Sequence, residues 1–238
     1  GEADGQEVAY RRIRAWKDSR GEIDPSRARD KWTAEDKQAG YVVRIDARFL
    51  DGEKIADSVG TYFMTPDRRE EAWLIQMVIK DPSQRKPATW REVGARSGSS
   101  MSVVTDGAQE SKAAQPTVPD RGYIAQVEAF LLPQLLLRGN PKEGANRAGD
   151  YGFYTYQSEV GKVQVRRDDL AAVQGGLGAW QIKTRMNEDR PAQVSIYNDR
   201  GDLLKTTMPD DRGVWTATTL QKLGQIWQAK GLPMGPQS

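Results

Sequence analysis

Three pairs of adjacent carboxylates are the residues in this chain best suited to acid–base chemistry. They are Glu70/Glu71, Asp168/Asp169 and Asp210/Asp211. Glycoside hydrolases place two carboxyl groups on either side of the bond that they cleave. Neighbouring residues on a strand point to opposite faces, so a sequential pair on a strand does not act together easily. A carboxylate-dependent hydrolase is therefore only an alternative, and these acids are otherwise expected in solvated turns.

The chain contains no histidine and no cysteine. Their absence excludes thiol nucleophiles, disulfides, zinc sites of the Cys/His type and the Ser-His-Asp device. Ser83–Lys86 matches the Ser-x-x-Lys of β-lactamase-type enzymes, but that motif requires a helix, and Pro82 and Pro87 indicate a loop. We therefore expect no catalytic residue, no cofactor and no tightly bound transition metal.

The tripeptide Arg200-Gly201-Asp202 is the one found in many cell-adhesion ligands. Asp-Arg-Gly also recurs at Asp120–Gly122, Asp199–Gly201 and Asp211–Gly213. Asp bonds its own backbone and Gly accepts positive φ, so this sequence favours a turn. Alternating residues on both sides predict a β-hairpin. An interaction or scaffold protein that presents such hairpin tips is a further alternative.

The charge balance argues against nucleic acid as a partner. Lys and Arg number 35 and Asp and Glu number 33, a net charge of +2, whereas nucleic-acid binders have a clear basic excess. The longest apolar stretch, Phe130–Leu137, is far shorter than the ~20 residues of a membrane span, so no transmembrane segment is expected. The chain begins at Gly1 without Met, which we interpret as the result of a removed leader.

Residues 6–38 are predicted to be helical. Ala9, Ile13 and Trp16 recur at helical spacing, and Thr33 with Asp36 resembles a capping box. Two interpretations follow: a basic amphipathic helix on a membrane surface, or a helical arm packed on a sheet. Residues 1–39 are accordingly expected to form an N-terminal helical arm.

From Gly40 the period changes to two, which is typical of strands. Tyr41, Val43, Ile45, Ala47 and Phe49 share one face. Asp51-Gly52 is a hairpin signal, and two further strands with one apolar face complete a meander up to residue 80. Two short strands and a long polar connection over 106–121 are predicted next.

The second half of the chain is predicted to contain a helix, then a block of strands, then another helix. A helix is predicted over Tyr123–Leu132 and ended by Pro133, because the residue before Pro avoids the α region. About five strands follow from Tyr151, and a helix begins near Thr218. The fold class is therefore α+β and mainly antiparallel β: a curved sheet or half-barrel with the N-terminal arm, one central helix and a C-terminal helix. Residues 40–238 are expected to form one domain.

Two segments resemble a known family. Gly60–Met77 looks like an early strand pair, and Ala179–Lys205 looks like a late meander, of the LolA/LolB-like bacterial periplasmic lipoprotein carriers. The resemblance implies a curved half-barrel closed by helices over an apolar cavity. It also implies a location in the periplasm or cell envelope, with a peripheral position at the membrane.

The function expected from these observations is a non-enzymatic binding or carrier protein for an apolar small molecule or lipid. Trp180 must share a face with Ile182 and Met186, because Gln181, Lys183 and Arg185 alternate with them. The central helix is expected to cover that face, or to form a packed core with it. The candidate ligand contacts are Trp180, Ile182, Met186, Phe130, Leu131 and Trp73.

Overall fold

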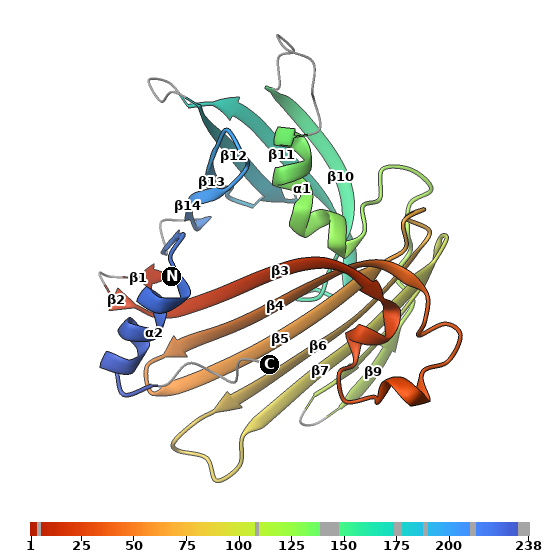
Figure 1. The fold of residues 1–238 in the computed structure, drawn as a ribbon, viewed down its shortest axis with the longest axis horizontal. Coiled ribbons are helices and arrows are strands. Elements are labelled where there is room, and N and C mark those ends of the chain that lie inside the picture. Colours follow the sequence, from red (N-terminus) through yellow and green to blue (C-terminus); the bar gives the residue numbers. More distant parts are fainter. Residues whose placement is uncertain are drawn as a thin grey trace. The chain divides into compact units, whose positions relative to one another are not determined.

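The computed structural model describes residues 1–3, 6–107, 110–138, 148–173, 178–187, 190–209 and 213–232. These residues form two antiparallel sheets and two α-helices (Figure 1). The chain divides into two compact units, and each is described by itself. The first unit contains Gly1–Tyr10, Leu131–Phe153 and Val165–Ser238. The second unit contains Arg11–Phe130 and Tyr154–Gln164.

The seven-stranded sheet is a meander in which each strand lies beside the next one in the chain. Its strands are β3 (Ala9–Ser19), β4 (Ala39–Asp51), β5 (Lys54–Met64), β6 (Glu70–Lys80), β7 (Ala88–Ser97), β8 (Ser100–Asp106) and β9 (Ser111–Ala114). The meander predicted from Gly40 to residue 80 is confirmed. Its first turn uses Gly52 at φ 59°, a backbone conformation that favours glycine.

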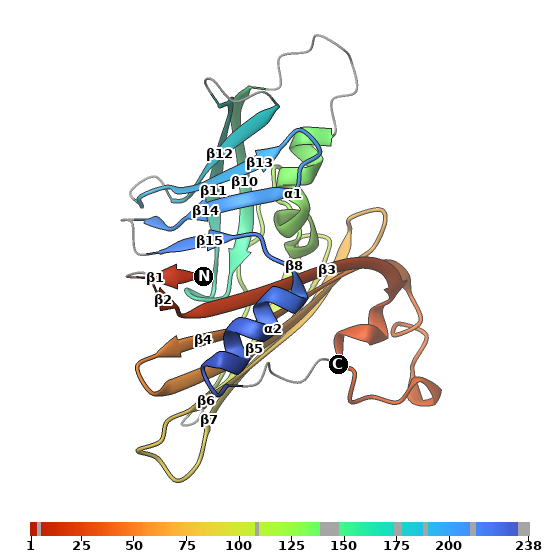
Figure 2. The same ribbon diagram turned by 60° about the vertical axis from the view of Figure 1, so that its left-hand side comes forward.

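The eight-stranded sheet has the order β10-β11-β12-β13-β14-β15-β1-β2. Its strands are β10 (Gly149–Gln157), β11 (Lys162–Ala172), β12 (Ala179–Met186), β13 (Gln193–Asn198), β14 (Leu203–Thr207), β15 (Val214–Thr216), β1 (Glu2–Ala3) and β2 (Gln6–Glu7). Figure 2 shows β13, β14, β15 and β1 side by side. The second block of strands expected from Tyr151 is confirmed, and the N-terminal strands extend it.

The α+β class with curved antiparallel sheets is confirmed. Within the described residues neither strand order returns to its first strand, so both sheets are open. The division into an N-terminal arm, residues 1–39, and one β domain, residues 40–238, stays a prediction.

The expected N-terminal helical arm is wrong. Ala9–Ser19 form the edge strand β3, followed only by short 3-10 turns, η1 (Arg20–Ile23) and η2 (Arg29–Lys31). The capping-box bonds do form: the Thr33 N–H donates to Asp36 at 2.9 Å, and the Asp36 N–H donates to Thr33 Oγ1 at 3.2 Å. They close a single turn. Pairing with β4 satisfies the backbone of β3, whereas a short isolated helix has only marginal stability.

The central helix is longer than predicted, because it continues through Pro133. Helix α1 is Gln126–Arg138 rather than Tyr123–Leu132. Leu132 is 5% exposed and Leu137 is 0% exposed, so apolar residues are buried on both sides of the proline. Burying such side chains contributes about 1.5–3 kcal/mol each, which offsets much of the cost of about 3 kcal/mol for an internal proline.

The core of the first unit lies between the second half of α1 and β11 to β13. Leu137, Leu170, Ile182 and Tyr197 form a buried cluster, and Leu136, Tyr151, Trp180 and Leu203 pack against it. Helix α2 (Leu220–Ala229) begins at its N-cap Thr219, whose side chain accepts the N–H of Lys222 at 3.2 Å. Trp227 of α2 is buried, with its ring centroid 4.9 Å from that of Tyr10. The predicted C-terminal helix is thus confirmed.

The expected connection over 106–121 is partly a strand. β9 pairs with the end of β8, from Val103 opposite Ala114 to Asp106 opposite Ser111. All four residues of β9 are exposed. Residues 115–119 have no regular structure. This edge of the sheet therefore has little packing to protect it.

Limited trypsin digestion is expected to cleave first at Lys112 or Arg121. Both side chains are exposed, one on the edge strand and one beyond it. Arg44 and Arg48 lie in β4, which pairs with β5 along its length, and paired strands resist proteases. Mass spectrometry of the first fragments identifies the sites. Initial cleavage at Arg44 or Arg48 contradicts the strand assignment, and a stable fragment beginning at Gln38, after cleavage at Lys37, supports a division near residue 39.

Candidate binding face

One face of β4 to β7 carries two rows of apolar side chains in register. In the first row the cross-strand partners are Ala47, Ser58, Met77 and Trp90. In the second row they are Phe49, Ala56, Ile79 and Ala88. We call these eight residues the apolar rows. Their pairing follows from the period of two: because the strands share one apolar face, the register that aligns those faces is fixed.

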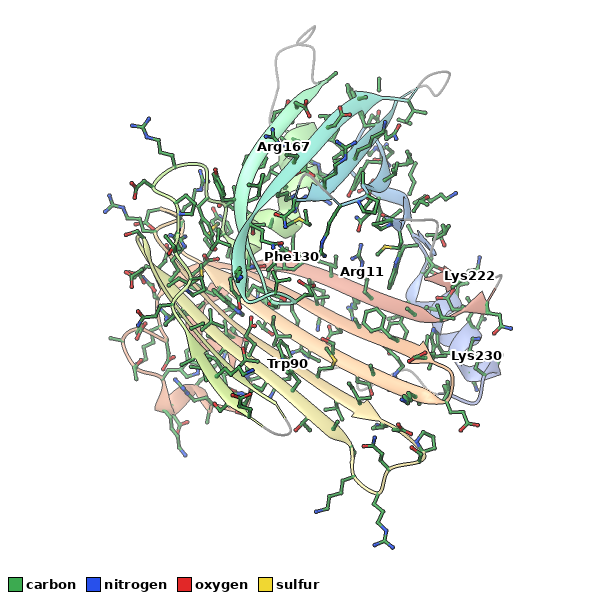
Figure 3. The ribbon with its side chains drawn as sticks, turned by 180° about the vertical axis from the view of Figure 1, so that it is seen from behind. Arg11, Trp90, Phe130, Arg167, Lys222 and Lys230 are labelled. Carbon is green, nitrogen blue, oxygen red and sulfur yellow. The ribbon has the colours of Figure 1, made fainter. Side chains whose placement is uncertain are left out.

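None of the apolar rows belongs to the buried core. Seven of the eight residues are partly exposed, and Phe49 is 41% exposed. Trp90 on β7 is labelled in Figure 3. Partly exposed large side chains in adjacent rows make a continuous apolar surface, and such surfaces mark interaction sites when they are extensive.

The edge strand β3 extends this face. The Nζ atom of Lys17 lies 5.7 Å from the centre of the Tyr41 ring, so Lys17 projects on the face of Tyr41. By alternation, Ala15 and Ile13 of β3 project on that face too. Ile13 is 43% exposed.

On β5 both rows have a small side chain, and a glycine follows them on the same face. Ala56, Ser58 and Gly60 are successive residues on this face of the strand. Larger side chains flank them, Phe49 on β4 and Met77 on β6. A Cβ atom at Gly60 would meet the Tyr62 hydroxyl at 2.7 Å, so the Tyr62 ring leans over Gly60 and ends the line of small residues.

The other end of the same face is covered by aromatic and polar residues. The rings of Tyr62 and Phe130 have centroids 4.9 Å apart, and those of Trp73 and Tyr156 are 5.1 Å apart. Trp73 is 0% exposed and lies across Gly94, where an added Cβ would come within 2.0 Å of its ring. Gly94 is therefore required for this packing.

Glu71 anchors the first turn of α1 at this covered end. Its carboxylate accepts bonds from Arg96 Nε at 2.7 Å, from the Tyr123 hydroxyl at 2.5 Å and from the backbone N–H of Gln126 at 2.9 Å. Glu71 is 1% exposed. A buried carboxylate is stable only when paired and hydrogen-bonded, and the helix N-terminus adds a favourable dipole.

Glu92 is a second buried carboxylate, and it accepts hydrogen bonds from three neutral donors. It accepts bonds from Trp73 Nε1 at 2.8 Å, from the Tyr156 hydroxyl at 3.1 Å and from the Ser158 hydroxyl at 2.8 Å. It is also 1% exposed. These bonds connect β7 with residues 156–158.

Three phenols at this end are held in the neutral form. Burial, followed by the charge of Glu71, raises the pKa of Tyr123 far above its ordinary value. Burial, followed by the charge of Glu92, likewise raises the pKa of Tyr62 and of Tyr156. Tyr123 and Tyr156 thus remain hydrogen-bond donors to the two carboxylates.

A polar cavity of about 350 Å³ lies beside this network, and its lining includes Arg68, Arg96, Tyr123 and Glu128. Its cations are already neutralised. Arg68 Nε lies 2.6 Å from Glu128, and the Arg96 guanidinium donates to Glu71 and to the carbonyls of Arg68 and Gly98, both at 2.8 Å. The cations that line this cavity therefore already have protein partners, so the cavity does not require a ligand.

In each described carboxylate pair, the two side chains project from opposite faces of their strand. Glu71 and Asp168 are buried, whereas their neighbours Glu70 and Asp169 lie on the opposite faces of β6 and β11. Asp210 and Asp211 lie outside the described residues. No cluster of three or more acidic side chains suited to a metal ion occurs among the described residues. Neither described helix is long and apolar enough to cross a membrane.

The predicted ligand contacts are divided between the two units. In the first unit, Trp180, Ile182 and Met186 share a face of β12, as predicted. Ile182 is 1% exposed and belongs to the core cluster, while Trp180 packs against that cluster. Leu131 is half-buried on α1. In the second unit, Phe130 is half-buried and Trp73 is fully buried. Their contact with a ligand stays a prediction.

The apolar rows contain none of those six residues. The sequence placed Phe49 and Met77 on the apolar faces of their strands, but it gave no sign that the face is covered at one end only. The strand that contains Trp90 follows the loop that was predicted at Ser83–Lys86. That loop is confirmed, since residues 81–87 connect β6 to β7.

Arg200-Gly201-Asp202 forms the predicted hairpin turn between β13 and β14. The Asn198 side-chain oxygen accepts the N–H groups of Arg200 at 3.0 Å and Asp202 at 2.8 Å. Asn198 Nδ2 donates to the Asp202 carboxylate at 3.0 Å, and Arg138 donates to the Arg200 carbonyl at 2.7 Å. Gly201 is buried against α1. The tripeptide thus has structural partners, which disfavours an adhesive function.

Comparison with models of known protein families finds no family that matches this chain. Comparison with curated proteins finds no significant match. Among solved structures, the chain is similar to a beta-barrel-like protein of domain of unknown function DUF1849 from Brucella abortus. The two chains share 12% sequence identity, with 87% of this chain and 94% of that chain covered and a TM-score of 0.47. That description states no activity.

Replacing Glu71 by Gln is expected to destabilise the protein more than replacing Glu92 by Gln. Glu71→Gln leaves the Arg96 guanidinium buried without its counter-charge, and breaking such a pair costs about 3–5 kcal/mol. Glu92→Gln keeps an acceptor for neutral donors, so a loss of about 1–2 kcal/mol is expected. Urea denaturation measures both. Equal losses contradict the assigned difference between the two carboxylates.

Stability is expected to fall as the pH rises above about 10. The folded-state pKa values of Tyr62, Tyr123 and Tyr156 are raised, so the folded state retains protons that the unfolded state releases near pH 10. The stabilisation is therefore present below that pH and lost above it. Denaturation at pH 8 and pH 10.5 measures it, and Tyr62→Phe should reduce the loss. Phenolate absorbance from all eight tyrosines near pH 10 without unfolding contradicts it.

Proposed function

We propose that this chain is a non-enzymatic binding or carrier protein, and that its ligand is an apolar, acyl-chain-like molecule held on the apolar rows. The observation that carries the proposal is the partial exposure of these rows. Eight residues in register, seven of them apolar, face solvent at one end of a sheet whose other end is closely packed.

The arrangement of large and small residues suits an elongated ligand. Ala56 and Ser58 form a low line along β5, with Phe49 on one side and Met77 and Ile79 on the other. A chain that lies along β5 would contact apolar side chains on both sides. Removing apolar area from water contributes roughly 25 cal/mol per Å², and this is the main driving force available to a ligand without polar groups.

The covered end supports binding rather than catalysis. The two buried carboxylates on this face, Glu71 and Glu92, are each 1% exposed, and their oxygens are hydrogen-bonded. A substrate on the apolar rows would have no access to them. The apolar rows themselves carry one hydroxyl, that of Ser58, with no acid or base beside it in the rows.

We place this activity outside the cytoplasm, in the cell envelope. The support is the resemblance of Gly60–Met77 and Ala179–Lys205 to the LolA/LolB-like carriers. Cell fractionation with an antibody against the natural protein tests the location, and recovery only in the cytoplasm opposes it.

Replacing a small residue of β5 by a large apolar one is expected to weaken binding, although it removes no apolar surface. Ala56→Phe adds an aromatic ring between Phe49 and Ile79, so the affinity for a fluorescent fatty acid should fall at least about tenfold, equivalent to 1.4 kcal/mol. Fluorescence titration measures it. If general hydrophobicity were responsible, the added ring would strengthen binding instead, and that result refutes the proposal.

Gln76→Phe is the matched control. Gln76 is exposed on β6 and projects from the opposite face of the same sheet, because it lies between Ile75 and Met77. The same aromatic gain there should leave the affinity unchanged within a factor of about two, well below the tenfold step of 1.4 kcal/mol. Trp90→Ala, which removes a large wall from the first row, should weaken binding.

A further inference from the structure

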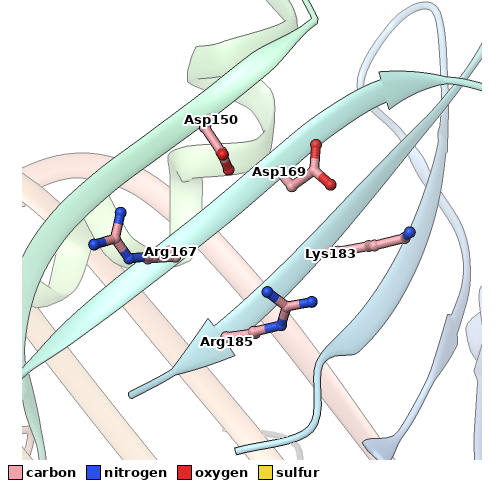
Figure 4. A pocket seen from close by; sticks show the side chains of 5 residues that line it. All are labelled: Asp150, Arg167, Asp169, Lys183 and Arg185. Carbon is pink, nitrogen blue, oxygen red and sulfur yellow. The ribbon is translucent and has the colours of Figure 1, made fainter. Parts of the chain in front are cut away.

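A cavity of about 290 Å³ in the first unit is lined by charged side chains from three neighbouring strands (Figure 4). The lining residues are Asp150 of β10, Arg167 and Asp169 of β11, and Lys183 and Arg185 of β12. We call this cavity the charged pocket. Its residues alternate with Leu170 and Ile182, which are buried in the core cluster, so they project from the opposite, outer face of the sheet.

Two like charges are directly opposite each other in the charged pocket. The cross-strand partner of Arg167 is Arg185, and that of Asp169 is Lys183. Like charges at directly opposite positions destabilise a sheet. The register therefore places two positive charges on neighbouring strands of the charged pocket.

The two cations of β12 form no ion pair with any residue that the structure describes. Within the part of the chain that the structure describes, neither Lys183 nor Arg185 takes part in an ion pair, although Asp169 is directly opposite Lys183. On the core face of β11 and β12, by contrast, the charged side chains are paired. There Arg166 donates to Asp168 at 2.7 and 3.1 Å, and Thr184 donates to Asp168 at 2.6 Å. The charges on the buried face are therefore paired, whereas Lys183 and Arg185 on the outer face form no ion pair with a described residue.

We propose that the charged pocket binds a small phosphate ester. Guanidinium and ammonium groups are the side chains that recognise phosphate oxygens, through charge-assisted hydrogen bonds. The phosphate would meet Arg167, Lys183 and Arg185, whose three positive charges exceed the two negative charges of Asp150 and Asp169.

The two carboxylates define the rest of the ligand. Ionised carboxylates accept hydrogen bonds and donate none, so Asp150 and Asp169 suit hydroxyl groups beside the phosphate. They also repel a polyanion, which excludes a nucleic-acid backbone. The cavity volume of about 290 Å³ is just below the ~300–1,000 Å³ of drug-sized small-molecule sites, which favours a compact polyol phosphate.

Glycerol 3-phosphate is the probe, titrated into the full chain and followed by isothermal calorimetry and by amide chemical shifts. Saturable binding is expected, with shifts confined to β10, β11 and β12. Arg185→Gln and Lys183→Gln should each weaken it at least about tenfold, which is 1.4 kcal/mol. Both side chains are exposed, and circular dichroism confirms that the variants fold.

Lys205→Gln is the matched control. Lys205 is exposed on β14 and lies opposite Ile196, which lies opposite Gln181, so it shares the face of Lys183 two strands away. Its removal changes the net charge equally and should leave the affinity within a factor of about two, well below a tenfold step. An equal loss in Lys205→Gln would indicate general electrostatic attraction and overturn the proposal.

Two further outcomes also overturn it: no saturable binding of glycerol 3-phosphate, or equal affinity for inorganic phosphate, which lacks the hydroxyl-bearing part. Glycerol alone should not bind. The charged pocket and the apolar rows are in different units, so failure of one proposal leaves the other unaffected.

Discussion

The buried ion pair between Glu71 and Arg96 is the interaction on which the second unit depends. Arg96 donates to Glu71, to two turn carbonyls at 2.8 Å and stacks under the Tyr123 ring, with its guanidinium carbon 4.8 Å from the ring centre. Glu71 in turn receives the first N–H of α1. One carboxylate thus connects β6, β7 and the start of the helix, and a buried charge of this kind tolerates no loss of a partner.

This network determines which part of the sheet face is available. The segment of α1 nearest Gln126 is fixed over Glu71, and the aromatic pairs Tyr62–Phe130 and Trp73–Tyr156 fill the space beside it. The apolar pattern continues along the same strands beyond that cover. A sheet face that is apolar over its whole length but covered over part of it leaves the apolar rows exposed, and that is the physical basis of the proposed ligand site.

The strands were predictable from sequence because their period of two is local information, as in Tyr41 to Phe49. The N-terminal segment was not, because its local pattern indicates the wrong element. Ala9, Ile13 and Trp16 have helical spacing, whereas in the structure Ile13, Ala15 and Lys17 project on one face of a strand. Pairing with β4, which is a non-local interaction, decides between them. Pro133 illustrates the same point, since burial of Leu137 outweighs the local preference of proline.

The hydrogen bonds of the buried carboxylates Glu71 and Glu92 could not be predicted from the sequence for a related reason. Glu71 and Tyr123 are 52 residues apart, and Glu92 and Tyr156 are 64 apart, so nothing local indicates that they meet. In the structure, alternation along β6 and β7 puts Glu71 and Glu92 on the apolar face, where an unpaired acid costs several kcal/mol, whereas Glu71 was expected in a solvated turn. An acid on an otherwise apolar face is therefore itself a signal: it requires a long-range donor, and the donors here come from the segments that close one end of the face and leave the other open.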